Sequence, residues 1–309
     1  MENGIVVETI GGTPPGDLQH LITGFYSFDQ ALACGMPRTP GGPTNVLWEI
    51  FGYQGVGKST LVEMLAAKAA GNKTICYAAI EPCDPSMVVK ILSSSGFTGK
   101  LIFIQHENHE DTLEEVLLRE KDENTGVVIL DSLGALQAAV NVDNDLEDAN
   151  MGKNAFLINK FARTSLLHLR NRKSPILILA TNHIHQIMGG RGTTTSGGVV
   201  MGYATRIRLF LSSGERFDDG TYVLTGRVDK NSYGLENGHF RLVFLADYGF
   251  HEGLTAWQDC EQYGLAKRDR VIKMGDTSFG FASKLIQQAK DGNVGIFQPF
   301  KDALLELGK

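Results

Sequence analysis

The sequence predicts an α/β fold: a mostly parallel sheet with helices on both faces, an antiparallel extension and a short C-terminal appendage. From residue 45 onward, short apolar runs alternate with helix-forming stretches, which is typical of strand–helix–strand units with right-handed crossovers. The run 127–130 is apolar throughout, as expected for a strand buried on both faces. After Gly198, β-like runs follow one another with only turns between them, which indicates antiparallel strands.

The order of elements divides the chain into three parts. Residues 1–42 form a Gly- and Pro-rich lead-in, residues 43–267 the core, and residues 268–309 a short C-terminal region. Strands are expected at 5–10, 46–51, 74–80, 101–105, 127–130, 175–180, 205–212, 221–229 and 240–246. Helices are expected at 27–33, 58–70, 85–95, 112–121, 154–172, 253–263 and 278–290.

Composition bounds the class of protein. The 309 residues are 42% hydrophobic and 21% charged, which is ordinary for a globular protein. The longest apolar stretches, such as 176–180, are too short to span a bilayer, and residues 1–16 contain no apolar run. The four cysteines show no CxxC spacing, so we expect reduced thiols rather than disulfides or zinc. These features predict a cytoplasmic protein without a membrane partner.

Charge is distributed unevenly along the chain. The net charge is −6, yet residues 1–150 carry 8 Lys and Arg against 21 Asp and Glu, whereas residues 151–309 carry 21 against 14. A chain so polarised can present a basic surface while remaining acidic overall. Charge alone leaves two interpretations open, a surface that binds nucleic acid or a chance imbalance of solvated faces.

A phosphate-binding loop follows the first core strand, because residues 52–59 match the pattern G-x-x-x-x-G-K-[ST]. Its glycines let backbone N–H groups turn towards phosphate oxygens, and the start of the next helix adds partial positive charge. Lys58 is expected to reach the β- and γ-phosphates of ATP, and the Ser59 hydroxyl to bind Mg²⁺. The residues expected to contact the nucleotide here are Gly52, Tyr53, Gln54, Gly55, Val56, Gly57, Lys58, Ser59 and Thr60.

Two carboxylates follow other strands of the predicted parallel sheet. Asp131 ends the strand 127–130, which places it beside the phosphate-binding loop, where it would hold Mg²⁺ through water. Glu81 ends the strand 74–80 and would orient the water that attacks the γ-phosphate. The sequence therefore predicts an ATP-hydrolysing site.

Several motifs occur together in a fixed order. They are residues 21–32 before the phosphate-binding loop, 48–52 entering it, Glu81, 130–133, 180–183, the Thr/Gly-rich run 193–198, and 228–231. In this order the chain resembles the RecA recombinase family, most of all its bacterial and phage members, over residues 21–267. The resemblance implies a RecA-like P-loop ATPase core. In it Lys58 and Glu81 are catalytic, and His183 lies at the strand end that senses the γ-phosphate.

The resemblance implies further roles. Asp84 and Met87 would lie near the adenine, and Lys230 would reach the nucleotide of the adjacent subunit, so that the active site is complete only in a filament. Two DNA-binding loops would run from about 138 to 151 and from about 187 to 198. The DNA-contacting residues so implied are Met151, Arg191, Gly192, Thr193, Thr194, Thr195, Ser196, Gly197 and Gly198.

The chain departs from the family pattern in several places. His183 stands where the family commonly has Gln, Ser232 where it has a second interface lysine, and Met87 where an aromatic residue is expected against adenine. The N-terminal polymerisation helix is absent; only the run 5–10 could replace it, as a strand added to a neighbour's sheet. A compact phage-type recombinase fits these differences.

The residues themselves also indicate DNA binding. Segment 186–198 is rich in glycine and hydroxyl groups and carries one cation, Arg191, so we expect an irregular loop that wraps a phosphate backbone without reading bases. An ordinary flexible surface loop is the alternative. The first loop is acidic, so DNA contact there is expected through backbone donors or Met151.

Three functions are compatible with these features. The first is a recombinase that forms filaments on single-stranded DNA and pairs it with homologous double-stranded DNA, helped by single-strand-binding and loader proteins. The second is a hexameric helicase-like motor, which the Thr-rich second loop makes less favoured. The third is a regulatory paralogue that binds ATP without exchanging strands, which the residues His183 and Ser232 keep open.

Overall fold

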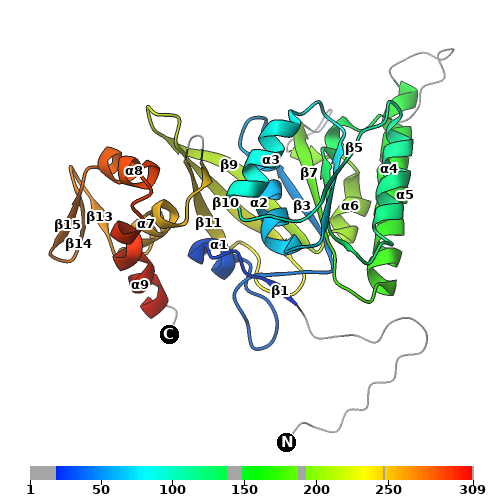
Figure 1. Ribbon diagram of the computed structural model, residues 1–309. Coiled ribbons are helices and arrows are strands. Elements are labelled where there is room, and N and C mark those ends of the chain that lie inside the picture. Colours follow the sequence, from blue (N-terminus) through cyan, green and yellow to red (C-terminus); the bar gives the residue numbers. More distant parts are fainter. Residues whose placement is uncertain (1–18, 138–147, 187–192, 246–247, 308–309) are drawn as a thin grey trace, which may run out of the picture.

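The computed structural model describes residues 19–137, 148–186, 193–245 and 248–307 (Figure 1). Its helices are α1 (Tyr26–Ala31), α2 (Lys58–Ala70), α3 (Pro85–Ser94), α4 (His109–Arg119), α5 (Asp148–Asn171), α6 (Gly198–Ala204), α7 (Glu252–Gln262), α8 (Ala282–Lys290) and α9 (Gln298–Leu307), with 3₁₀ turns η1 (Leu133–Ala135) and η2 (Val294–Phe297). The main sheet contains β3 (Leu47–Gly52), β4 (Thr74–Ala79), β5 (Leu101–Ile104), β6 (Thr125–Asp131), β7 (Leu177–Gln186), β8 (Thr193–Thr195), β9 (Ile207–Arg216), β10 (Tyr222–Asn231), β11 (His239–Leu245) and β12 (Gly249–Phe250). Smaller sheets contain β1 (His20–Leu21) with β2 (Gly42–Pro43), and β13 (Lys267–Arg268) with β14 (Ile272–Met274) and β15 (Thr277–Gly280).

The main sheet combines a parallel half with an antiparallel half. Its strand order is β12-β11-β10-β9-β3-β7-β6-β4-β5, and β8 pairs with β7 outside this path. All pairings from β9 to β5 are parallel, whereas β9, β10, β11 and β12 pair antiparallel in succession. This arrangement confirms the predicted fold class, including the antiparallel extension.

Helices cover both faces of the sheet, and the residues of each strand alternate between them. In β4, Ile75 and Tyr77 pack in the cluster that contains α1, α2 and α3, whereas Cys76 and Ala78 pack in the cluster that contains α4, α5 and α6. Both clusters are buried, which explains why the parallel strands are almost uniformly apolar.

The C-terminal elements form a third packed unit at one end of the molecule (Figure 1). Helices α7, α8 and α9 enclose Trp257 and Phe300, both fully buried, and the same cluster includes Val223 and Val243 from β10 and β11. The predicted boundary at residue 268 falls inside β13, and α7 already packs with this unit. The short strands β13–β15 were not predicted, because strands of two to four residues carry little periodicity. Helix α9, of ten residues, was not predicted either.

The expectation of an irregular segment over 186–198 is wrong for its described part. Strand β7 runs on to Gln186 and pairs with β8 in an antiparallel hairpin, with Ile184 opposite Thr195 and Gln186 opposite Thr193. Helix α6 then begins at Gly198. Threonines favour a strand, and this preference outweighed the glycines on either side. Residues 187–192, like the predicted strand 5–10, lie outside the described residues.

Over the described residues, none of the helices combines the length and the apolar character needed to cross a membrane.

Candidate active site

The phosphate-binding loop lies where the central strand β3 turns into helix α2. All six residues of β3 are buried, and α2 begins at Lys58 directly after Gly57, whose φ of 94° is left-handed. A Cβ atom on Gly57 would lie 2.9 Å from the Tyr222 hydroxyl oxygen. A Cβ atom on Gly52 would lie 2.5 Å from the carbonyl oxygen of Leu211. Gly57 therefore needs to be glycine for both its backbone conformation and the space around it, and Gly52 for space.

A pocket of about 330 Å³ opens above this loop. Because neighbouring parallel strands end at the same edge, residues far apart in sequence meet here, as expected for a crevice at the carboxyl ends of a sheet. Its lining residues are Gln54, Gly55, Gly57, Lys58, Ser59, Thr60, Glu81, Asp131, His183, Arg216 and Tyr222. Nine of these eleven were identified from the sequence; Arg216 and Tyr222 were not.

Lys58 is turned back onto the loop. Its Nζ donates hydrogen bonds to the carbonyl oxygens of Gly52 at 3.2 Å and Tyr53 at 2.9 Å, and the side chain is only 7% exposed. Burial lowers the pKa of Lys58, an effect that the charges of Asp131 and Glu81 oppose. A buried cation held by neutral carbonyls is under-compensated, so phosphate oxygens are the partners that its environment favours.

Asp131 is held in place by hydrogen bonds to both of its carboxylate oxygens. The Tyr77 hydroxyl donates to its Oδ2 at 2.8 Å, and the Thr181 hydroxyl donates to its Oδ1. Burial and the nearby carboxylates of Asp131 and Glu63 raise the pKa of Tyr77, so the phenol keeps its proton and remains a donor. A fixed carboxylate beside the Ser59 hydroxyl is an oxygen donor set that fits Mg²⁺ together with phosphate oxygens and water.

No group of three or more His, Cys, Asp or Glu side chains in the described ranges is arranged to hold a metal ion by itself.

Glu81 has two donors on the same oxygen. His183 Nε2 lies 2.8 Å from its Oε1, and the Ser132 hydroxyl donates to that atom as well. Burial raises the pKa of Glu81, but the hydrogen bonds from Ser132 and His183 and the charges of His183 and Lys58 outweigh it and hold the pKa below its ordinary value. Glu81 is therefore an ionised acceptor. Its contact with His183 was not foreseen from the sequence, which relates both residues only to the γ-phosphate.

A buried polar network joins this pocket to the second loop region. Asn182, next to His183, donates to Glu49 Oε1 at 2.8 Å and to the carbonyl oxygen of Ser196 at 2.9 Å. The fully buried Glu49 also accepts from Arg208 at 2.6 Å, and Arg208 donates to the Thr195 hydroxyl at 3.1 Å. Two neighbouring residues of β7 therefore have different contacts: His183 lines the phosphate pocket, and Asn182 bonds to the second loop region.

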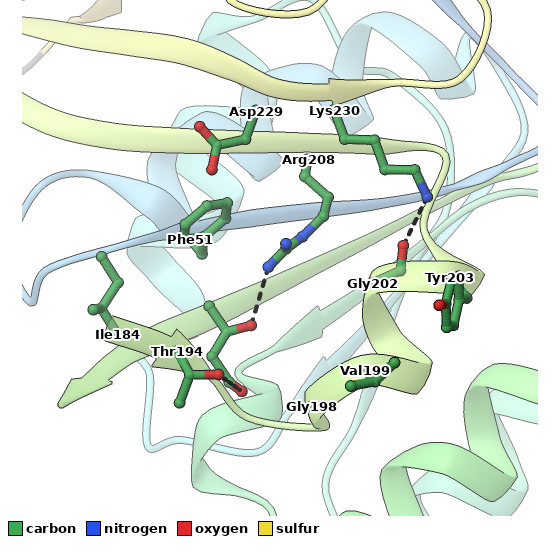
Figure 2. Close-up of a pocket in the computed structure, with 11 residues that line it drawn as sticks. Phe51, Ile184, Thr194, Gly198, Val199, Gly202, Tyr203, Arg208, Asp229 and Lys230 are labelled. Atoms are coloured by element: carbon green, nitrogen blue, oxygen red, sulfur yellow. Dashed lines mark hydrogen bonds between the residues drawn. The ribbon is translucent and has the colours of Figure 1, made fainter. Parts of the chain in front are cut away.

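A second pocket, of about 590 Å³, lies beyond that network (Figure 2). Its walls come from β3, β7, β8, α6, β9 and β10, and Lys230 stands at its edge. Lys230 Nζ donates to the carbonyl oxygens of Gly202 and Thr205, both at 2.7 Å, where it caps the C-terminal end of α6 (Figure 2). Beside it Tyr203 is 74% and Val199 72% exposed.

The remaining predicted residues fall in three places. Thr194 and Thr195 lie in β8 and line the second pocket, with Gly198 at the start of α6. Asp84 is the N-cap of α3, where it accepts from Ser86 N at 2.9 Å, and Met87 is half exposed on that helix; neither lines the first pocket. Arg191, Gly192 and the first loop over 138–147 lie outside the described residues, and Met151 lies in α5 with its side chain outside the described part.

Comparison with known proteins agrees with this architecture. The family model described as "RecA N-terminal domain" matches residues 3–229, well over half of the chain. Proteins named "Protein RecA" from Francisella tularensis subsp. novicida (strain U112) and subsp. tularensis (strain WY96-3418) are each 25% identical over 286 residues, which cover 89% of this chain and 75% of each relative. The chain therefore belongs to the RecA family.

Proposed function

We propose that this protein is an ATP-dependent DNA recombinase, which assembles into helical filaments on single-stranded DNA and exchanges strands with a homologous duplex. The RecA family is a family of P-loop ATPases, and the relatives above carry the name RecA. The proposed activity belongs in the cytoplasm of a bacterial or phage-infected cell, with single-strand-binding and loader proteins as helpers.

The observation that carries the proposal is the path of strand β7. Thr181 contacts Asp131, His183 contacts Glu81, and Asn182 between them holds the carbonyl oxygen of Ser196. His185 Nε2 lies 3.1 Å from the Ser196 hydroxyl, which ties the same strand to the loop a second time. A change at the nucleotide is therefore passed to the proposed DNA-binding segment by one continuous element.

In the proposed reaction, a water oxygen attacks the γ-phosphorus while the bond to the β–γ bridging oxygen breaks, which yields ADP and phosphate. Glu81 accepts a hydrogen bond from that water, and Lys58 compensates the charge on the β- and γ-phosphates. Ser59 and Asp131 would hold Mg²⁺, which neutralises charge on the phosphate oxygens. His183 contacts the same carboxylate that would accept from the water, so in this proposal it releases Glu81 before hydrolysis.

Lys230 is proposed to contact the nucleotide of the adjacent protomer, which requires it to leave the carbonyl oxygens that it now caps. Lys230→Ala should cost about 1–3 kcal/mol of stability from the lost charged hydrogen bonds. Cooperative assembly and DNA-stimulated hydrolysis should disappear together. Lys273→Ala, at an exposed lysine of β14, is the control. Normal assembly and turnover in Lys230→Ala would show that this lysine serves α6 alone.

Arg191 is proposed to contact DNA phosphate. Arg191→Ala should weaken binding to single-stranded DNA for all sequences equally and lower the slope of log affinity against log salt by about one, because one fewer phosphate is neutralised. Hydrolysis without DNA should stay near the parental rate. An unchanged salt slope, measured by fluorescence anisotropy from low to high salt, would exclude the contact.

Negative-stain imaging with single-stranded DNA and a non-hydrolysable ATP analogue separates the three functions. An open helical filament supports the recombinase. A closed ring would indicate the helicase-like motor, and the absence of any assembly would indicate the regulatory paralogue.

A further inference from the structure

The phosphate pocket extends to both sides of the central strand β3. Glu81 follows β4, Asp131 ends β6 and His183 lies within β7, and these three strands lie on one side of β3 in the sheet order. Arg216 and Tyr222 belong to β9 and β10, on the other side. The first group is the hydrolytic end proposed above. The second has no role in that proposal, although it lines the same pocket.

Tyr222 is a fixed wall of this second end. Its ring stacks on Phe244 with centroids 5.0 Å apart and an interplanar angle of 26°, and Phe244 meets Phe250 edge to face at 5.6 Å. Burial raises the pKa of Tyr222, partly offset by the charge of Arg216 and a hydrogen bond with Thr60. The neutral phenol of Tyr222 therefore lies against Gly57 of the phosphate-binding loop and against Thr60 in the first turn of α2.

Arg216 lies over the ring of Tyr222, with its guanidinium carbon 5.4 Å from the ring centroid. Two acidic residues of the same hairpin have other partners: Glu215 pairs with Arg268 and Asp219 with Lys290, each at 2.7 Å. Within the described ranges no carboxylate forms an ion pair with Arg216, whose side chain is exposed. The planar guanidinium of Arg216 therefore packs on the Tyr222 ring in the lining of the phosphate pocket. Its N–H groups are available to bind a ligand.

The direction of the nucleotide follows from this arrangement. If the γ-phosphate lies between Lys58 and Glu81, the polyphosphate runs along the loop, and the nucleoside leaves the pocket at the opposite end. Thr60, in the first turn of α2, and Tyr222 mark that end. A guanidinium there can stack on a base and donate to the α-phosphate, since its planar face and its N–H edge serve different partners.

We propose that Arg216, supported by Tyr222, binds the nucleoside end of ATP, contacting the α-phosphate and the base from within the same protomer. This inference rests on the proposed nucleotide site and adds to it a contact that β9 and β10 supply. The β9–β10 hairpin also forms the two ion pairs above with β13 and α8. A change in the hairpin on nucleotide binding would therefore be passed to the C-terminal unit through Glu215 and Asp219.

Isothermal titration of ATP, ADP and inorganic tripolyphosphate, each with Mg²⁺ and without DNA, tests the assignment. Arg216→Ala should raise the dissociation constants of ATP and ADP by the same factor, about tenfold, and raise that of tripolyphosphate clearly less, because tripolyphosphate keeps the contact at the α-phosphate position but has no base. Arg216→Lys should restore only part of the affinity, because an ammonium lacks the planar face. Tyr222→Leu, which removes the supporting ring, should weaken ATP and ADP in the same pattern.

Arg227→Ala is the matched control, because Arg227 also lies over a ring, that of Phe210, on the same strand pair but outside the pocket. It should bind all three ligands like the parent. Unchanged ATP and ADP binding by Arg216→Ala, with the parental thermal unfolding midpoint, overturns the inference alone. A loss as large for tripolyphosphate as for ATP also overturns it, since Arg216 would then contact phosphate only and not the base. A parent protein that binds no ATP would refute the nucleotide site itself.

Discussion

Replacing Lys58 with alanine is expected to raise the dissociation constant for ATP at least about 100-fold, and hydrolysis should be lost with binding. Two charge-assisted hydrogen bonds to phosphate are worth about 1.5–3 kcal/mol each, so this magnitude corresponds to losing one or two of them. The fold should survive, because Lys58 bonds only to carbonyl oxygens of its own loop. Equilibrium titration with ATP and Mg²⁺ measures the effect.

Lys68→Ala is the control for that substitution. Lys68 lies in the same helix, ten residues further on, and pairs with Glu252 rather than lining the phosphate pocket. It should bind ATP like the parent. Parental affinity in Lys58→Ala would mean that the pocket above α2 is not the ATP site.

Glu81→Gln should preserve ATP binding and slow hydrolysis by about 10²–10⁴-fold, the usual contribution of a group that accepts a proton or orients water in the transition state. The amide is nearly isosteric and can still meet Ser132, so the pocket should keep its shape. Single-turnover hydrolysis with saturating ATP separates this step from binding.

Glu107→Gln is the comparison variant, because Glu107 follows the next strand, β5, and lies outside the pocket. It should hydrolyse ATP at the parental rate. If Glu81→Gln hydrolyses ATP at the parental rate as well, another group orients the water, and the contact between Glu81 and His183 does not affect hydrolysis.

The parts of this site that could be read from the sequence are those fixed by strand ends. Glu81 and Asp131 each follow an apolar run, and the parallel pairing of their strands brings them to one edge of the sheet, whereas His183 was identified only from the resemblance to the RecA family. The apolar runs and the glycine-rich loop therefore contained enough information to predict the fold class and to place these two carboxylates in the pocket above the loop.

Arg216 and Tyr222 could not be found this way. They lie on an antiparallel hairpin, and their position over α2 depends on how far β9 and β10 extend, including two register shifts between those strands. A single sequence shows neither the strand lengths nor the bulges. The only available signal was an Arg and an aromatic residue on either side of the turn 217–221.

The hairpin at β7 and β8 illustrates a different limit. Glycine and hydroxyl residues over 186–198 indicated an irregular loop, but three successive threonines pair with the end of β7. Strand β7 had been expected to end at Ala180, six residues before its actual end, because the apolar run stops there and polar residues follow. Their hydrogen bonds to Glu49, Asp131 and Glu81 supply the stabilisation that hydrophobic burial gives elsewhere.

Strand exchange itself is the most direct test of the proposed function. Circular single-stranded DNA, a homologous linear duplex, ATP and Mg²⁺ should yield joint molecules, with or without a single-strand-binding helper, whereas a heterologous duplex or the Lys58→Ala variant should yield none. If the protein forms ATP-dependent filaments but never gives joint molecules under these conditions, the recombinase assignment is contradicted and the regulatory paralogue takes its place.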